Sequence, residues 1–405
     1  MKTKILFVMA SMHRGGAERS LINLLEMLSP DKYDIAFLCF DDKGELMNQI
    51  PQYVRCLSTP RTIECLTTSS VKRALKIFSL PALYYRVRYK LACKKTINMN
   101  GYIRSQQKWE IAYKNAVPML KEKFDVAVAF MHSLPTYYVI DKVQAQRKFV
   151  WVHHDYSTYQ EGKDFDFPYF SQADRVVTVS QECAQVLCNI FPSISDQFTY
   201  LMNLNPVEKI RRQAVAFIPN EYLSTEGKRI VSIGRLVNIK RFDRAIEAAS
   251  ILHRMGLPFN WFIIGVGELH QQLSEQISRL KLENCVHLLG ARENPYPYIK
   301  YADVVVQTSS FEGKSIVLDE AKILCRPIIS TDYASVHDQI VDGETGIIVS
   351  QSSEAIAEAL MRLFAQPEMG DRLSHTLKQL SDDSTQVLAE YEYLFDGCYS
   401  ENMER

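Results

Sequence analysis

The chain has 405 residues, a length that favours two domains, each large enough to bury a hydrophobic core of its own. Its 47 basic and 47 acidic residues balance, so the chain as a whole offers no bulk attraction to nucleic acid. Nine cysteines without a Cys-x-x-Cys pair argue against a zinc pattern and a disulfide framework, and no run of about 18 apolar residues predicts a membrane-spanning helix. We therefore expect a cytoplasmic protein with reduced thiols.

The chain begins with a predicted strand, turn and helix. An apolar run over 4–10 predicts a buried strand, and apolar residues at helical spacing predict a helix that ends at 28. Between them lie Gly15 and Gly16, without the third glycine of a dinucleotide-binding fingerprint. This spacing fits a tight turn with no ligand as well as a turn that lets the backbone approach a phosphate. Similar apolar runs predict further strands at 33–40, 124–131, 148–153 and 173–180.

The stretch from 71 to 108 differs in composition from the rest of the chain. It holds ten basic residues and no Asp or Glu, and aromatic residues are interleaved with the cations. A solvated helical face fits this composition. So does a surface that contacts an anionic membrane, because each cation near such a leaflet adds about 1 kcal/mol of attraction and Tyr and Trp suit the interface. The cations are Lys72, Arg73, Lys76, Arg86, Arg88, Lys90, Lys94, Lys95, Arg104 and Lys108.

Two patterns could in principle hold a metal ion. His153 and His154 follow the strand predicted at 148–153, but no third and fourth ligand is spaced to match, and a histidine that packs inside the structure is the alternative. Asp164 and Asp166 form an Asp-x-Asp pattern, yet it lies in an aromatic loop and does not directly follow a strand. We therefore expect no metal site.

The second half of the chain repeats the plan of the first. Residues 203–228 are polar and predict the connection between two domains. A strand over 229–234 follows, then a loop with Arg235 and Lys240, then an amphipathic helix over 242–255. Two surface cations are one interpretation of this loop. The other is a phosphate site, because a planar guanidinium fork and an ammonium group both suit phosphate oxygens.

The stretch 303–330 predicts a strand, a polar loop, a helix and another strand. The loop therefore lies at the carboxyl end of a strand in a doubly wound sheet, where such sheets bind ligands. The helix begins near Ser315, so its first N–H groups point at the loop and favour an anion there. Glu312 precedes this helix and Glu320 lies inside it, eight positions further on. The spacing alone also fits two solvated acids.

This segment resembles the retaining glycosyltransferases of family 4, which have the GT-B fold. The resemblance is carried by the Glu-Gly and Glu-Ala pairs at 312–313 and 320–321 and by the Gly-Arg-Leu-x3-Lys run at 234–240. It implies an α/β protein of two doubly wound, Rossmann-like domains that face a cleft. The first domain would span 1–204 and the second 205–384, with a C-terminal helix in 385–405 that packs back on the first.

The resemblance also implies roles for single residues. Arg235 and Lys240 would bind the donor diphosphate, Glu312 the donor-sugar hydroxyls and Glu320 the ribose. His154, with His153 as the alternative, would lie beside the donor sugar. The catalytic candidates are therefore His154, Glu312, Arg235 and Lys240. The further donor-site candidates are Gly15, Gly16, Arg292, Gly313, Lys314, Ser315 and Glu320.

One departure from the family pattern concerns Lys314 and Ser315, where the family has an aromatic residue or leucine and then proline. Lysine at this position could add a phosphate contact, or it could mark a subgroup with a different donor.

The implied reaction transfers a sugar, with retained configuration, from a nucleotide-diphosphate sugar to a glycan or polyprenyl-linked acceptor in polysaccharide biosynthesis. UDP-sugar is the expected donor. No metal or other cofactor is expected, because Arg235, Lys240 and the helix at Ser315 would stabilise the leaving diphosphate. Peripheral contact of 71–108 with the inner face of the cell membrane would suit a lipid-linked acceptor. The alternative is a sugar-nucleotide epimerase of the same fold.

Overall fold

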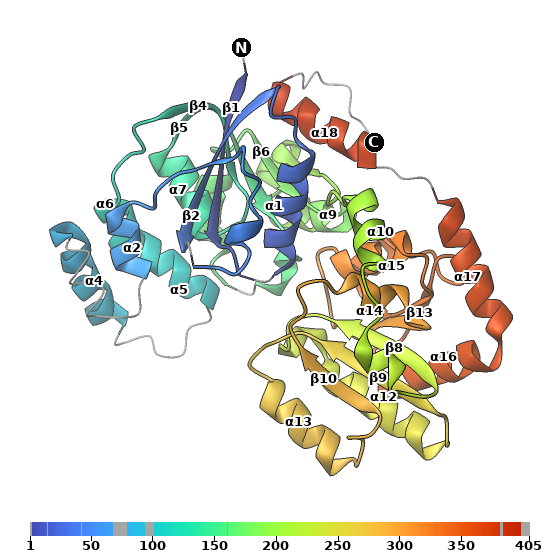
Figure 1. Ribbon diagram of the computed structural model, residues 1–405. Coiled ribbons are helices and arrows are strands. Elements are labelled where there is room, and N and C mark those ends of the chain that lie inside the picture. Colours follow the sequence, from blue (N-terminus) through green and yellow to red (C-terminus); the bar gives the residue numbers. More distant parts are fainter. Residues whose placement is uncertain are drawn as a thin grey trace. The chain divides into compact units, whose positions relative to one another are not determined.

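The computed structural model describes residues 2–13, 15–41, 43–67, 79–93, 101–159, 161–380 and 384–397. The chain divides into two compact units, one made of Met1–Leu204 with Gln386–Arg405 and the other of Asn205–Thr385 (Figure 1). Each unit contains one sheet of parallel strands with helices on both faces. This confirms the predicted α/β class with two doubly wound, Rossmann-like sheets. No helix in the described ranges is long and apolar enough to cross a membrane.

The sheet of the first unit has the strand order β3-β2-β1-β4-β5-β6-β7, and every pair is parallel. The order reverses between β1 and β4, so the loops after these two strands lie at the switch point of the sheet. The strands are β1 (Thr3–Ser11), β2 (Tyr33–Asp41), β3 (Arg55–Cys56), β4 (Lys123–Ala129), β5 (Gln144–Val152), β6 (Arg175–Thr178) and β7 (Phe198–Tyr200).

Helices cover both faces of this sheet. On one face lie α1 (Gly16–Met27) and α18 (Ser384–Asp396). The other face is covered by α2 (Arg61–Thr67), α4 (Leu80–Cys93), α5 (Gly101–Lys108), the π-helix η2 (Trp109–Tyr113), α6 (Lys114–Ala116), α7 (Leu134–Lys142), α8 (Lys163–Phe170) and α9 (Gln181–Ile190). Short 3-10 helices are η1 (Met47–Gln49), η3 (Tyr156–Thr158) and η4 (Pro192–Gln197).

The last described helix, α18, belongs to the core of the first unit (Figure 1). Tyr391 stacks near Trp151 with ring centroids 6.1 Å apart, and Phe395 meets Phe7 edge to face at 5.9 Å. Arg147 on β5 donates hydrogen bonds to backbone carbonyls in the last turn of α18, at 3.0 and 2.6 Å. Cations are favoured at helix C-termini, so these bonds hold the helix on the sheet.

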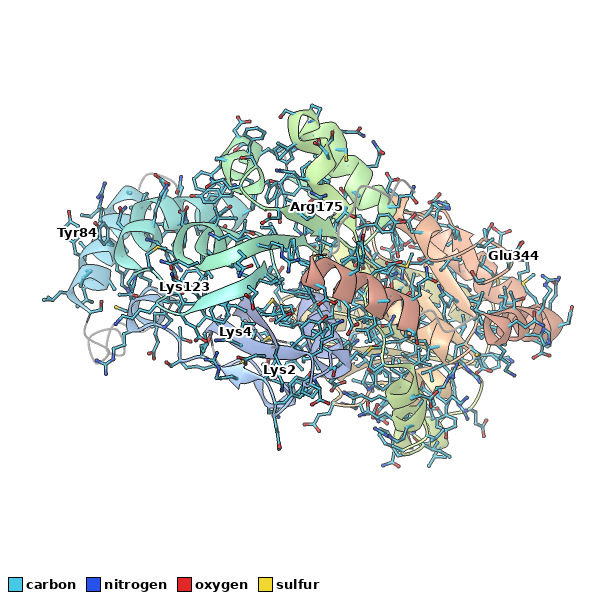
Figure 2. All side chains as sticks on the ribbon, turned by 90° about the horizontal axis from the view of Figure 1, so that it is seen from above. Lys2, Lys4, Tyr84, Lys123, Arg175 and Glu344 are labelled. Atoms are coloured by element: carbon cyan, nitrogen blue, oxygen red, sulfur yellow. The ribbon has the colours of Figure 1, made fainter. Side chains whose placement is uncertain are left out.

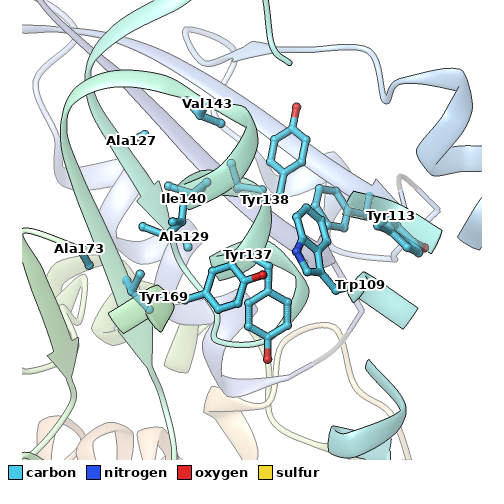
Figure 3. Close-up of a cluster of buried hydrophobic side chains, with 14 of the residues drawn as sticks. Trp109, Tyr113, Ala127, Ala129, Tyr137, Tyr138, Ile140, Val143, Tyr169 and Ala173 are labelled. Carbon is cyan, nitrogen blue, oxygen red and sulfur yellow. The ribbon is translucent and has the colours of Figure 1, made fainter. Parts of the chain in front are cut away.

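Buried aromatic residues follow directly after the stretch 71–108 and pack in the core of the first unit. Trp109 lies 5.9 Å from Tyr137 and 6.2 Å from Tyr113, measured between ring centroids, and Tyr169 lies 4.6 Å from Tyr137 (Figure 3). Trp109 and Tyr113 lie in η2, directly after α5, and both are fully buried. The residues that directly follow the stretch 71–108 are therefore part of the protein core.

The second unit repeats the plan with the order β10-β9-β8-β11-β12-β13, again all parallel, and its switch point lies between β8 and β11. The strands are β8 (Lys228–Ile233), β9 (Phe259–Ile264), β10 (Val286–Gly290), β11 (Val304–Gln307), β12 (Ile328–Thr331) and β13 (Ile347–Val349). One face carries α12 (Phe242–Arg254), α13 (His270–Arg279), α16 (Ser353–Ala365) and α17 (Pro367–Gln379). The other carries α10 (Val207–Ala214), α11 (Asn220–Leu223), α14 (Tyr296–Lys300) and α15 (Ile316–Ile323).

Candidate functional site

The main candidate site lies at the switch point of the second unit, where the loops after β8 and β11 meet. The backbone N–H of Ser310 donates to the carbonyl of Ile239 at 2.8 Å, and the Thr308 hydroxyl donates to the carbonyl of Lys240, also at 2.8 Å. Both loops follow the carboxyl ends of adjacent parallel strands, which is where open α/β sheets bind ligands.

Glu312 and Lys240 form the centre of this site. The Lys240 ammonium lies 2.5 Å from Oε1 of Glu312, and the two side chains are 20% and 14% exposed. The same oxygen accepts hydrogen bonds from the Ser309 hydroxyl at 2.6 Å and from the Gln307 amide at 3.3 Å. Three donors on one oxygen hold the carboxylate in a single orientation. Within the described chain its Oε2 accepts no hydrogen bond, so that oxygen can receive a ligand hydroxyl.

Arg235 lies in the same β8 loop but is exposed, and among the residues that the structure describes its guanidinium has no partner. The backbone of this loop is held by the loop after β9, because the N–H of Leu236 donates to the carbonyl of Val266 at 2.9 Å. A Cβ atom at Gly265 would overlap the carbonyl of Gly234, so this close approach of the two loops requires glycine. The loop that carries Lys240 thus also presents an exposed guanidinium fork, which has no partner in the described chain.

Lys314 and Ser315 have partners inside the protein. Ser315 caps α15, accepting from the Leu318 N–H at 3.4 Å, and its own N–H donates to the Gln339 amide oxygen at 2.8 Å. The Lys314 side chain is only 7% exposed, and its ammonium lies 3.8 Å from Asp319 on α15. A phosphate contact by Lys314 would therefore have to replace this internal ion pair. Gly313, which joins Glu312 to Lys314 in the sequence, is buried.

The remaining candidates of the second unit are Arg292 and Glu320. Arg292, two residues after β10, donates to the Glu221 carboxylate at 2.7 Å and to the Tyr298 hydroxyl at 2.9 Å. In the described part of the chain no hydrogen bond or ion pair joins Arg292 to Lys240 or Glu312. Glu320 is 4% exposed and lies inside α15, one turn and a half beyond the Ser315 cap.

In the first unit, Gly15 and Gly16 form the junction of β1 and α1. Gly15 is the N-cap of α1 in an extended conformation. A Cβ atom added at Gly15 would overlap the carboxylate of Glu18, which lies in the first turn of the helix and is only 8% exposed. A negative charge is favoured at the N-terminus of a helix, and here the Glu18 carboxylate provides it.

His153 and His154 follow β5, and the structure distinguishes them. His153 pairs through Nε2 with the carbonyl of Phe130 at 3.1 Å and lies over that residue's ring, with centroids 4.8 Å apart. The Nε2 atom of His154 is buried and has no hydrogen-bond partner in the described part of the chain. A buried polar atom without a partner costs free energy, and of the two histidines His154 is the one whose Nε2 lacks a partner in the described chain.

Burial keeps these histidines neutral. It lowers the pKa of His153 to about 3 and that of His154 to about 4. A third histidine, His132, lies three residues after the end of β4, and burial holds its pKa well below the ordinary value. At neutral pH each ring therefore offers one N–H donor and one acceptor nitrogen, and none carries a charge.

Sequence reasoning did not single out His132 or Tyr159. The His132 ring lies 4.2 Å from the His154 ring, and its Nε2 pairs with the Tyr159 hydroxyl at 2.8 Å. One signal was available, because His132 follows a strand as His154 does and β4 is the neighbour of β5.

Asp166 of the Asp-x-Asp pattern is a buried hydrogen-bond acceptor. Its carboxylate receives the Tyr137 hydroxyl at 2.5 Å and the Tyr156 hydroxyl at 2.6 Å, and it also pairs with the Tyr102 hydroxyl. It is 1% exposed. No cluster of three or more His, Cys, Asp or Glu suited to a metal ion is present in the described ranges.

The chain has the two-unit α/β fold of the GT-B class. Residues 216–379 match the family model described as glycosyl transferases group 1. The chain is a glycosyltransferase, and its segment 216–379 is similar to the glycosyl transferases of group 1. The match to this family model does not favour the alternative, a sugar-nucleotide epimerase.

Curated relatives and solved structures agree with this class. A Campylobacter jejuni N-acetylgalactosaminyltransferase acting on a diphospho-undecaprenol glycan is 26% identical over 345 residues, 85% of each chain. The amylovoran biosynthesis glycosyltransferase AmsK of Erwinia amylovora is 30% identical over 173 residues, 39% of this chain and 42% of that protein. In fold, the chain is similar to Anabaena HepE in complex with UDP, with a TM-score of 0.69 at 15% identity over 98% of this chain and 100% of that one.

Proposed function

We propose that this enzyme transfers a sugar from a UDP-sugar, with retention of configuration, to a glycan or polyprenyl-linked glycan acceptor in the synthesis of a surface polysaccharide. The observation that carries the proposal is the group of Arg235, Lys240 and Glu312 at the switch point of the second unit. The named acceptor of the Campylobacter jejuni relative and the UDP bound to HepE support the choice of acceptor and donor classes.

Each residue of the site has a distinct role in this proposal. When the bond between the sugar and the diphosphate breaks, negative charge develops on the leaving diphosphate, and Arg235 and Lys240 stabilise it. Glu312 accepts hydrogen bonds from donor-sugar hydroxyls through Oε2, and Glu320 binds the ribose. His154 bonds a sugar hydroxyl through its unsatisfied Nε2. We assign no residue as a nucleophile.

We expect UDP-sugars to raise the midpoint of thermal unfolding and GDP- and ADP-sugars to have little effect. A ligand present at about 100 times its dissociation constant adds about 2.7 kcal/mol of stability, which a thermal-shift screen resolves. The same shift should be seen in EDTA, because two cationic side chains take the place of a metal. Transfer that EDTA abolishes and Mn²⁺ restores would contradict the cationic clamp, and a screen without any nucleotide-sugar shift would contradict the donor class.

The structure adds a specific element to the proposed membrane contact. On α4 four large apolar residues are 57–67% exposed, and their spacing of four, three and four places them on one helical face: Leu80, Tyr84, Val87 and Leu91. Figure 2 shows Tyr84 at the outer surface of the helix. The opposite face carries Ala82, which is fully buried, and packs against α2 and η2. Such a helix has a core-facing side and a second apolar side without a protein partner in the described chain.

Charge favours an anionic membrane as the partner of this second side. The helix contains Arg86, Arg88 and Lys90 and no acidic residue. Arg86 donates to the carbonyl of Cys65 at 2.7 Å, whereas Arg88 and Lys90 are exposed beside the apolar stripe. An interfacial helix combines these two features, an apolar stripe and flanking cations. Five further cations of the stretch lie outside the described residues, namely Lys72, Arg73, Lys76, Lys94 and Lys95.

The double substitution Leu80→Gln and Leu91→Gln should reduce binding to phosphatidylglycerol vesicles in a co-sedimentation assay. Leu223→Gln is the matched control, because Leu223 is 70% exposed and lies in the second unit. Binding of the unmodified protein should weaken at high salt, since exposed charges are screened within about 8 Å at physiological ionic strength. Equal binding to phosphatidylglycerol and phosphatidylcholine vesicles, or to neither, would leave α4 as a solvated face and favour a soluble acceptor.

A further inference from the structure

Two aromatic side chains determine how the His154 ring lies. The His132 ring packs on it at 4.2 Å with an interplanar angle of 53°, and the Tyr159 ring meets it edge to face at 5.0 Å and 89°. These two residues are also joined to each other, because the Tyr159 hydroxyl pairs with Nε2 of His132 at 2.8 Å. Rotation of His154 would therefore require both neighbours to move.

Tyr159 is in turn held by the tyrosines around Asp166. Its ring stacks on Tyr102 at 3.8 Å and 21°, and it meets Tyr156 edge to face at 5.4 Å. The hydroxyls of Tyr102 and Tyr156 lie 2.7 Å apart, and both bond to the Asp166 carboxylate. Gln106 adds a fourth donor to Asp166 at 3.3 Å.

This network brings together elements that are distant in sequence. Tyr102 comes from α5, Asp166 from α8, and the 3-10 helix η3 contributes Tyr156. All of them converge on the loops after β4 and β5, which carry His132 and His154. Burial raises the pKa of Asp166, and the tyrosine hydrogen bonds oppose that shift. A buried polar network that is fully bonded makes its surroundings rigid, and here the rigid surroundings end at one histidine nitrogen without a partner.

We propose that His132 and Tyr159 are positioning residues for His154, and that the buried Asp166 anchors them through Tyr102. The proposal rests on the proposed function, in which His154 bonds a hydroxyl of the donor sugar. The hydroxyl of Tyr159 fixes His132, the two rings fix the plane of His154, and Nε2 of His154 is thereby directed at the ligand. Neither positioning residue needs to touch the substrate.

The test is a double-mutant cycle between Tyr159→Phe and His154→Ala. Phenylalanine keeps the ring on Tyr102 and removes only the hydroxyl, so turnover should fall about tenfold, since small misplacements of a positioned group are costly. UDP affinity should not change, because Arg235 and Lys240 lie in the other unit. In the His154→Ala background the same substitution should cause no further loss. Turnover is measured as UDP release from the UDP-sugar that gives the largest thermal shift.

Tyr138→Phe is the matched control. Tyr138 is a fully buried tyrosine of the same core, and in the described chain its hydroxyl has no hydrogen-bond partner (Figure 3). Its removal should leave turnover unchanged. A Tyr159→Phe effect that adds fully to that of His154→Ala would overturn the positioning role alone. Unchanged turnover in His154→Ala would overturn both this proposal and the sugar role of His154, whereas loss of UDP binding in Arg235→Ala would still support the donor site.

Discussion

Lys240→Ala is expected to lower the affinity for UDP at least about tenfold, and Arg235→Ala to do the same. A charge-assisted hydrogen bond contributes about 1.5–3 kcal/mol, and about 1.4 kcal/mol corresponds to a tenfold change in affinity. The Lys240 side chain is only 20% exposed, so solvent screens its interaction with a diphosphate less than that of a surface lysine. Isothermal titration calorimetry with UDP measures the effect directly.

Lys228→Ala provides the control for these two variants. Lys228 begins β8, the strand whose carboxyl end leads to Arg235, and its ammonium lies 3.9 Å from Asp303 with 43% of its side chain exposed. Its loss removes one positive charge at the amino end of β8, whereas Arg235 and Lys240 follow the carboxyl end of that strand. UDP affinity should therefore stay the same. Unchanged UDP affinity in both Arg235→Ala and Lys240→Ala would rule out the cation pair as the diphosphate site.

Glu312→Gln is expected to reduce turnover about a hundredfold or more while UDP affinity is kept or increased. The substitution retains a side chain of the same shape but removes the charge that orients sugar hydroxyls, and losing one preorganised electrostatic group costs about 10²–10³ in rate. UDP affinity should not fall, because the Lys240 ammonium loses the carboxylate that neutralises it in the protein and can pair with the diphosphate alone.

The control for this second prediction is Glu344→Gln, an exposed glutamate in the same unit (Figure 2). The substitution changes the net charge by the same amount, and Glu344 lies outside the loops that follow β8 and β11. Turnover should therefore not change. Kinetic constants measured with a saturating UDP-sugar separate the two effects. A parallel fall in UDP affinity and turnover would instead place Glu312 among the residues that hold the site together.

The sheets were predictable because their signal is local. Buried parallel strands are continuous apolar runs, and the runs at 4–10, 33–40 and 229–234 lie within strands β1, β2 and β8 to within one residue. The loops after β8 and β11 could be placed at one edge of a sheet for the same reason. Their side-chain partners could not be predicted, because Lys240 and Glu312 are 72 residues apart and meet only when the strands pair.

Burial decided the cases in which neighbouring residues look alike. The sequence offered both His153 and His154, and packing gave His153 a backbone carbonyl while leaving Nε2 of His154 without a partner in the described chain. Lys314 follows the loop glycine and looks available to a phosphate, yet its side chain turns inward to Asp319.

The sequence by itself determined the two doubly wound sheets, the glycine loops and the places of Arg235, Lys240 and Glu312 at strand ends, because strand periodicity and turn chemistry act within a few residues. Only the tertiary structure decided that one oxygen of Glu312 accepts from three donors, that Asp166 is enclosed by tyrosines and that the rings of His132 and Tyr159 pack against His154. These partners come from elements far apart in the chain, and which of them meet depends on how the helices pack over the sheet.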